Sequence, residues 1–450
     1  MVQKSPGRKL VGPPVMLQDW DTEAEELTSK YWELFLDLLL VAASASLADG
    51  LKANLTWGGL AEFVALYLMV TSGYMLYSPQ ITTRFEDASL SHAAMVFFYL
   101  LGIAICTLYT SFRFAYQFAL GSFLQRAVVL CLLGVIYVHI ERARAFCRHF
   151  GAYIFVAAVL LLVGFFVRSW AVPCLWVVVA IENISPFYWP RLLSKEDLIP
   201  INIEHTKDRL GCFILVMLGE TVVSATITYR LLAATGSTIA DVSRYYWTLG
   251  LSFLLIFAFT LLYFHMQPAP QATGFHRSRI RGIMLFTLHK VLGAALLGVG
   301  VAVRLMVEAV TNGVQMSDAG AVLTGTSVGV SLLTLLLIRV QHYGGLEGQE
   351  ERYPPHVLVI FNAWWAIVTF FAAVPFVLVV FCNITDPVAS VAIYSGMICT
   401  LCVVESGFTH YLEPYLAGGM ESGEGDPLVT QEEETPPTYE STGTASHSLL

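Results

Sequence analysis

The amino-acid sequence predicts an all-α membrane protein, a polytopic bundle of about twelve transmembrane helices. Apolar residues occupy 56% of the 450 positions and charged residues only 13%, and the mean hydropathy is +0.65. Apolar stretches of roughly 20 residues, the length that crosses a hydrocarbon core about 30 Å thick, recur along the chain. In lipid a helix satisfies its own backbone N–H and C=O groups, so we expect these stretches to be helical. The composition excludes a soluble globular domain.

The expected spans follow one another with short connections. Six precede the loop at 190-207 and six follow it, which suggests two six-helix halves of like orientation, as in transporters built from parallel repeats. The spans lie near residues 31-49, 57-78, 90-112, 119-138, 151-168, 170-189, 208-228, 243-266, 280-303, 319-341, 355-382 and 388-411.

Three regions differ in composition. Residues 1-29 form a polar N-terminal segment, and residues 30-413 form the transmembrane domain. Residues 414-450 are rich in Gly, Glu, Pro, Ser and Thr. Such a segment cannot bury enough apolar surface to offset its chain entropy, so we expect an acidic, disordered cytoplasmic tail.

The tail contains the PPxY sequence Pro436-Pro437-Thr438-Tyr439. A polyproline turn followed by tyrosine suits the aromatic groove of WW domains, so the predicted partner is a WW-domain protein such as a ubiquitin ligase. The alternative is a chance tetrapeptide in a low-complexity tail.

The distribution of basic residues predicts that both termini are cytoplasmic, because short loops rich in Lys and Arg tend to stay on that side. Arg209 is among the many basic residues assigned to the cytoplasmic side. The net charge of −9 comes largely from the tail, and no basic footprint indicates nucleic acid. The predicted surroundings are therefore the lipid bilayer. The basic residues assigned to the opposite side are Lys52, Arg113, Arg126, Arg168, Arg230, Arg244 and Arg304.

Asn54 and Asn383 begin N-glycosylation sequons in short loops that this orientation places outside the cytoplasm. The cysteines lie mostly within spans and show no disulfide framework. Neither a metal site nor a cofactor is predicted from them, because no nearby Cys or His run completes a set of four ligands.

Ionisable residues inside the spans are the strongest functional signal, since each costs several kcal/mol in hydrocarbon unless it is paired or faces a cavity. Glu33 and Asp37 stand four residues apart on one helical face, and Glu220 lies midway along the seventh span. The candidates for an ion or substrate pathway are Glu33, Asp37, Glu182, Glu220, His289 and Lys290.

Two interpretations of these residues stay open. Asp37 and Glu220 either form structural ion pairs with Lys290 or an arginine, or bind a proton or cation with His289 as relay. For Glu33 the alternative to a functional role is an interfacial position. Arg304, Glu308 and Arg339 are expected to snorkel or lie in loops. Glu405 and His265 are lesser candidates, for which hydration at the end of the span is the alternative.

Several of these residues also carry a family resemblance. Trp32-Glu33-Leu34-Phe35-Leu36-Asp37 resembles the start of the low temperature requirement A (LtrA) family, and three further blocks agree over residues 30 to 411. The chain departs at Leu36 and Thr221, where the family usually has Phe and Ser, and in the loop 268-281. The further blocks are Thr83-Arg84-Phe85-Glu86-Asp87 with His92, which resembles a cytoplasmic-side motif; Glu204-His205 to Leu218-Gly219-Glu220-Thr221; and His289.

The resemblance implies a multi-span membrane protein of a family linked to growth in the cold, without an assigned substrate or reaction. The function favoured is a transporter or channel-like protein for protons, cations or a small solute, in which Asp37→Asn and Glu220→Gln would abolish transport but not folding. A lipid-modifying enzyme is an alternative, although the sequence has no HExxH, nucleophile elbow or Asp-rich diphosphate motif, and no catalytic residue is predicted. A scaffold or sensor acting through the tail is another.

Overall fold

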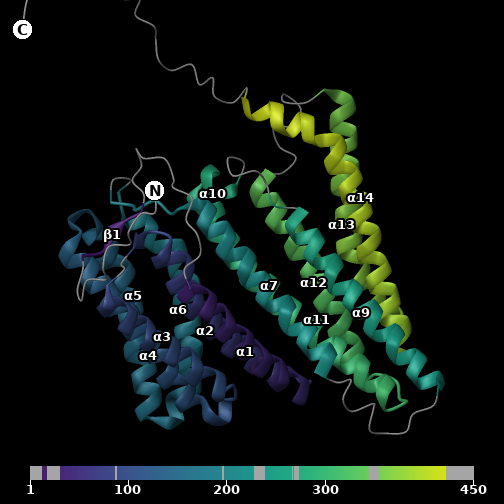
Figure 1. Ribbon diagram of the computed structural model, residues 1–450, viewed down its shortest axis with the longest axis horizontal. Helices are drawn as coiled ribbons and strands as arrows, with labels where there is room; N and C mark the ends of the chain where they lie inside the picture. Colours follow the sequence, from purple (N-terminus) through teal and green to yellow (C-terminus); the bar gives the residue numbers. More distant parts are fainter. Residues whose placement is uncertain are drawn as a thin grey trace, which may run out of the picture.

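The computed structural model describes residues 13–17, 31–86, 89–194, 197–227, 239–265, 267, 273–343 and 354–421. Within these residues, eleven helices are long and apolar enough to cross a membrane, which confirms the polytopic helical bundle (Figure 1). The strands in this part of the chain form a two-residue antiparallel ribbon, in which β1 (Val15–Met16) pairs with β2 (Phe85–Glu86).

The first half of the bundle contains six long helices. A π-helical turn, Ser78–Thr82, extends α2, and a 3-10 turn at Arg168–Trp170 separates α5 from α6 as two helices. Helix α4 packs against α3 and α5, α1 packs against α2 and α3, and α6 packs against α5 and α2. The helices are α1 (Tyr31–Ala53), α2 (Trp57–Tyr77), α3 (Leu90–Leu108), α4 (Ala115–His139), α5 (Arg144–Phe166) and α6 (Ala171–Tyr188).

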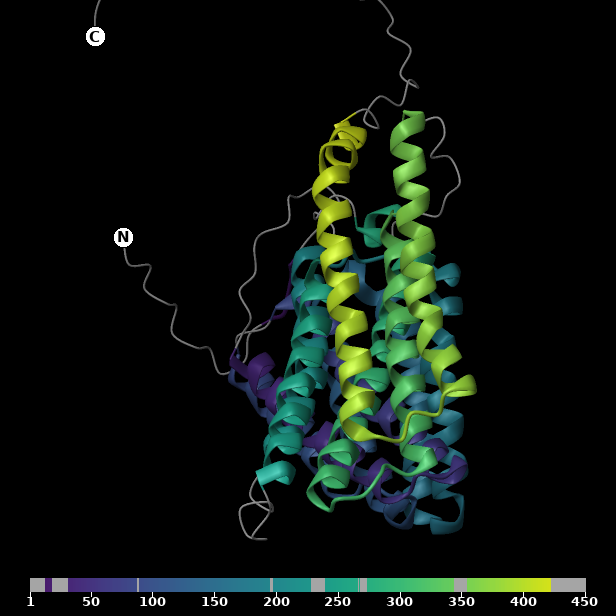
Figure 2. The ribbon, with the colours of Figure 1, turned by 90° about the vertical axis from the view of Figure 1, so that its right-hand side faces the viewer.

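The second half again contains six long helices, and it lies beside the first half with α7 and α11 nearest to α1 and α2 (Figure 1). Figure 2 shows that α13 and α14 extend beyond the other helices at one end of the bundle. The helices are α7 (Ile203–Ile227), α9 (Ile239–His265), the short α10 (Gly274–Arg277), α11 (Arg279–Thr311), α12 (Asp318–Tyr343), α13 (Pro355–Phe381) and α14 (Pro387–Glu421).

The C-terminal boundary lies later than the sequence suggests. Helix α14 continues to Glu421, so residues 414–421, expected to be disordered, are helical. The rest of the tail, including Pro436, Pro437 and Tyr439, lies outside the described residues, and WW-domain binding stays a prediction.

Helix α7 is long enough to span; its first two turns are rich in charged residues, and most of residues 210–227 are apolar. Its polar side chains include Arg209 and Glu220, which are 0% and 1% exposed. Helices α1, α9 and α11 pack around it. Charged groups are tolerated at membrane depth when neighbouring helices, rather than lipid, surround them.

Glycines allow α3 and α4 to approach closely. A Cβ atom added to Gly121 would lie 2.7 Å from the carbonyl oxygen of Gly102, and one added to Gly102 would lie 2.7 Å from that of Gly121. Small residues at a helix contact permit this backbone approach in membranes. Gly134 on the same helix has no atom within 4 Å of the corresponding position.

Gly121→Ala should therefore lower the free energy of unfolding by about 1–3 kcal/mol, because the opposing atom is backbone and cannot rotate away. Gly134→Ala is the matched control and should be neutral or stabilising by up to about 1 kcal/mol, since Ala is the better helix former. Thermal unfolding of both purified variants in one detergent measures the difference. Equal unfolding temperatures would show that the close contact is not formed.

Candidate functional site

Asp37 on α1 forms a two-point ion pair with Arg209 on α7. Nη2 and Nη1 of Arg209 lie 2.5 and 3.0 Å from the two carboxylate oxygens. Tyr74 Oη donates to Asp37 at 3.0 Å, and Arg209 Nε donates to Ser78 Oγ at 2.7 Å. This geometry supports the structural interpretation of Asp37, with an arginine rather than Lys290 as its partner.

Glu33 lies one turn earlier on the same face of α1. It lies in the first turn of α1 and is fully buried by the protein. Its carboxylate lies 3.2 Å from Nε2 of His205, which is on α7 and also buried. The burial follows from helix packing, because α7 covers the face of α1 that carries both acids. The two acids of α1 therefore link it to the second half of the bundle.

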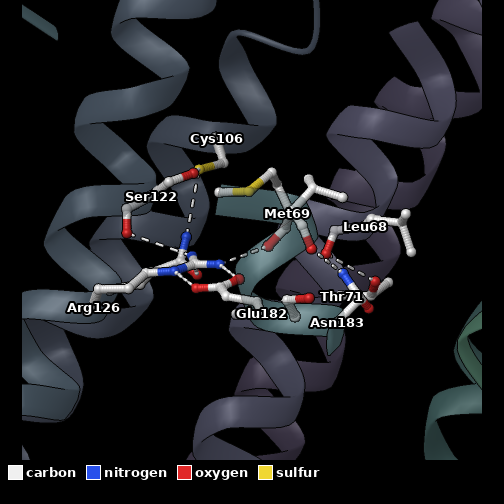
Figure 3. A network of polar contacts seen from close by, with 12 residues as sticks. Leu68, Met69, Thr71, Cys106, Ser122, Arg126, Glu182 and Asn183 are labelled. Carbon is white, nitrogen blue, oxygen red and sulfur yellow. Dashed lines mark hydrogen bonds and ion pairs between the residues drawn. The ribbon is translucent and has the colours of Figure 1, made fainter. Parts of the chain in front are cut away.

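Glu182 on α6 is paired with Arg126 on α4, and both side chains are buried (Figure 3). Arg126 Nε and Nη2 donate to the two oxygens of Glu182 at 2.8 and 2.7 Å, and Nη2 also donates to the carbonyl oxygen of Met69 at 3.2 Å. Arg126 lies within α4, inside the expected span 119-138, and is completely buried. A charge-assisted pair with both oxygens bound is among the strongest polar contacts available.

Lys290 on α11 reaches across to the first half. Its Nζ donates to Ser72 Oγ on α2 and to Asn183 Oδ1 on α6, both at 3.1 Å. Asn183 is oriented by its own amide, which donates to the Val179 carbonyl at 2.8 Å. The ammonium group is thus held by neutral oxygens at the contact between the two halves.

Glu220 and His289 lie in separate surroundings. The carboxylate of Glu220 is 4.0 Å from Nη1 of Arg304, whose shorter contact, at 2.5 Å, is to Asp49. The ring of His289 has Nε2 3.0 Å from Tyr263 Oη and Nδ1 2.7 Å from the Leu285 carbonyl. Both ring nitrogens are therefore engaged with groups other than the candidate acids.

A further buried pair joins Arg339 on α12 to Glu405 on α14. The two bonds measure 2.6 and 2.9 Å, and the guanidinium lies 4.6 Å from the ring centre of Trp364. Both residues are nearly inaccessible to solvent. The expectation of a snorkelling Arg339 and the alternative of a hydrated Glu405 are wrong, because α12 and α14 turn these residues toward each other rather than outward.

The segment around Arg84 follows the end of α2 and contacts Ile199 in the segment 198–201. Arg84 donates to the carbonyl and the side-chain oxygen of Gln80 at 2.8 and 3.0 Å, and to the Ile199 carbonyl at 3.3 Å. Burial lowers the pKa of Arg84 to about 9, so the side chain is still charged at neutral pH.

The remaining residues of this segment have packing contacts. Phe85 is buried and its ring packs 6.2 Å from that of Phe146. His92 Nε2 lies 3.3 Å from Tyr77 Oη. Glu86 belongs to β2, where it pairs with Val15. Asp87 lies outside the described residues. The segment therefore anchors the end of α2 against α3 and α5.

The two sequon asparagines are exposed in loops. Asn54 Oδ1 accepts a bond from Thr56 Oγ1 at 2.8 Å, and Asn383 Nδ2 donates to Asp318 at 2.9 Å. Asn383 also adopts a left-handed φ of 38°, which Asn tolerates better than most residues. Their glycosylation stays a prediction.

A cavity of about 230 Å³ lies between the two halves, and we call it the inter-half cavity. Helices α2, α5 and α6 of the first half border it, together with the segment 198–201; α10 and α11 of the second half border the opposite side. It holds far more than the roughly 10–15 Å³ that one water requires. Its polar inner end carries Ser72, Glu182, Asn183 and Lys290.

The predicted candidates thus fall into two groups, those that line the inter-half cavity and those that do not. Glu182 and Lys290 line the inter-half cavity, whereas Glu33, Asp37, Glu220 and His289 are not among the residues that border it. Sequence reasoning missed Arg126 and Arg209 as partners. A signal was present, because both lie inside expected spans, where an arginine requires a counter-charge or a cavity.

Comparison with known families gives one match. The family model of the bacterial low temperature requirement A protein (LtrA) matches residues 28–401, which is most of the chain and contains the cavity and the pairs Asp37–Arg209 and Arg126–Glu182. A comparison with curated proteins found no match. The extent of the family match shows that this chain belongs to the low temperature requirement A family.

Proposed function

We propose that this protein is a membrane transporter that binds a small solute in the inter-half cavity. The observation that carries the proposal is the position of the cavity, which is bordered by helices of both halves. Transporters built from two parallel halves bind their substrates at the interface between these halves, near the middle of the bilayer.

The depth of the cavity supports this function. Its lining runs along α11 from Arg279 to Lys290, about 17 Å along the axis at 1.5 Å per residue. This is more than half of a hydrocarbon core about 30 Å thick. A solute at Lys290 would therefore sit near the midplane. With the termini in the cytoplasm, as the basic residues predict, the cavity opens on the cytoplasmic side.

Ion pairs between α1 and α11 support a closed opposite end. Near the end of α1, Asp49 contacts Arg304 and Lys52 contacts Glu308. Both partners lie in the last third of α11, at the end remote from the cavity. These partly exposed pairs would separate when the halves rock, because exposed ion pairs contribute little free energy. The pairs Arg126–Glu182 and Arg339–Glu405 lie within single halves and would keep each half rigid.

Filling the cavity tests the proposal. Thr287 lines it from α11, and Thr287→Trp should remove most of the flux by occupying the space of the solute. Leu333→Trp is the matched control, because Leu333 is on α12 and 40% exposed. Purified protein in liposomes loaded with a metabolite extract, with mass spectrometry of the released solutes, provides the measurement.

The expected result is a set of solutes that leaves wild-type and Leu333→Trp vesicles faster than protein-free vesicles, and that Thr287→Trp retains. Release equal to that of protein-free vesicles in all samples would contradict transport. Equal release through Thr287→Trp and wild type would place the pathway elsewhere.

A further inference from the structure

The charged side chains that line the inter-half cavity are mainly basic. Among the described lining residues, Arg84, Arg279 and Lys290 are basic and Glu182 is acidic. The carboxylate of Glu182 is already bound at both oxygens by Arg126. Its charge is therefore balanced within the protein, and the cavity retains a positive potential.

Lys290 concentrates this charge at the inner end. It is 9% exposed, and its hydrogen-bond acceptors among the described residues are the neutral oxygens of Ser72 and Asn183. An ammonium group has three donors. Glu182 attracts this ammonium group, but both of its oxygens are bound by Arg126, which repels Lys290. The counter-charge that normally offsets the desolvation of a buried cation is therefore shared between two cations. A ligand with a negative group would supply that counter-charge.

The outer part of the cavity also carries positive charge. Arg84 is fixed by Gln80 and the Ile199 carbonyl, and its guanidinium lies 5.3 Å from the ring centre of Phe146. Arg279 lies exposed at the beginning of α11. Basic groups along a cavity with low-dielectric walls raise the local concentration of anions. The path from the opening to Lys290 is therefore attractive to a negative ligand.

The walls between these charges are apolar. Met75 and Leu76 border the cavity from α2, Phe150 from α5, and Ile283 and Phe286 from α11. A pocket with apolar walls and a few convergent polar groups is typical of small-molecule sites. These walls suit a ligand in which a compact apolar group is attached to the negatively charged group.

From this arrangement we infer that the inter-half cavity binds a small organic monoanion, with its acidic group on Lys290, Ser72 and Asn183 and its apolar body against the walls. The inference rests on the proposed function, since it names the class of solute that the cavity takes. It also assigns Lys290 as the residue that selects for negative charge.

Three probes of equal shape test the charge selectivity. Benzoate, benzamide and benzamidine carry negative, zero and positive charge on the same ring. In wild-type protein in nanodiscs, benzoate should bind and raise the unfolding temperature, and the other two should bind at least about tenfold more weakly. A tenfold difference in affinity corresponds to the lower end of the free energy that a hydrogen bond to a charged group contributes. The comparison uses only wild-type protein, so it does not depend on the folding of a variant.

Two substitutions of Lys290 test whether this residue selects for negative charge. Lys290→Gln should weaken benzoate binding by at least about tenfold and abolish the preference for benzoate over benzamide, while Lys290→Arg should retain that preference because it keeps the charge. Equal binding of the three probes to wild type, an absence of benzoate binding, or an unchanged preference in folded Lys290→Gln would overturn the inference.

Uptake of labelled benzoate into proteoliposomes separates this inference from the proposed function. Benzoate binding without uptake, and without release of any solute from the loaded vesicles, would support the anion site and contradict transport. Release of only neutral or basic solutes through the cavity, without benzoate binding, would support transport and overturn the anion site.

Discussion

Arg126→Leu should lower the free energy of unfolding by roughly 3–5 kcal/mol, because it leaves the carboxylate of Glu182 buried without its counter-charge. Both side chains are almost completely inaccessible to solvent, so water cannot replace the lost partner. Denaturation of the purified protein in detergent, followed by tryptophan fluorescence, measures the change.

Two controls separate the ion pair from general damage. The double variant Arg126→Leu, Glu182→Leu should recover much of the lost stability, since it removes both buried charges. Arg144→Leu breaks an exposed pair with Glu141 and should change the stability by less than about 1 kcal/mol. If Arg126→Leu behaved like Arg144→Leu, the buried pair would not be present in the folded protein.

Asp37→Asn should also destabilise the protein, by about 2–3 kcal/mol. Arg209 would keep an oxygen acceptor and its bonds to Tyr74 and Ser78 but would lose its counter-charge. The effect should be smaller than at Arg126, because the side chain of Asp37 is 13% exposed and partly hydrated. Folded yield and unfolding temperature measure it.

This result distinguishes the two roles proposed for Asp37. A structural role requires loss of stability in Asp37→Asn, and Arg209→Gln should be similarly damaging because it breaks the same pair from the other side. An Asp37→Asn protein with the wild-type unfolding temperature and no transport would instead support the ion-pathway role, in which the carboxylate acts on the transported species.

The fold was largely predictable from the sequence because the membrane imposes one simple rule, that about 20 consecutive apolar residues form a spanning helix. Eleven of the expected spans are apolar helices of sufficient length, and the close pair α5 and α6 is separated as expected. The end of α14 was misplaced. The Glu, Pro and Gly residues at 413–421 indicate a non-helical segment by composition, yet the helix continues to Glu421.

The partners of the buried charges were not predictable to the same extent. Spacing along α1 placed Glu33 and Asp37 on one face, and the structure shows both directed toward α7. The choice of Arg209 and His205 as partners depends on which helix packs against that face, which hydropathy does not reveal. For the same reason, the sequence did not show that Asn183 and Lys290 meet across the contact between the halves.

The buried charges of α7 have a consequence for biosynthesis. Arg209 and Glu220 are almost inaccessible to solvent in the folded protein, and a charged residue in the middle of a span opposes insertion into lipid by about 2.5–3.5 kcal/mol until other helices surround it. The partner of Arg209 lies on α1, which is synthesised earlier, whereas Arg304 lies on α11, which emerges later. Ribosome-bound chains that end before α11 should therefore hold α7 less firmly than the complete chain, because the contact between Glu220 and Arg304 forms only after α11 has emerged.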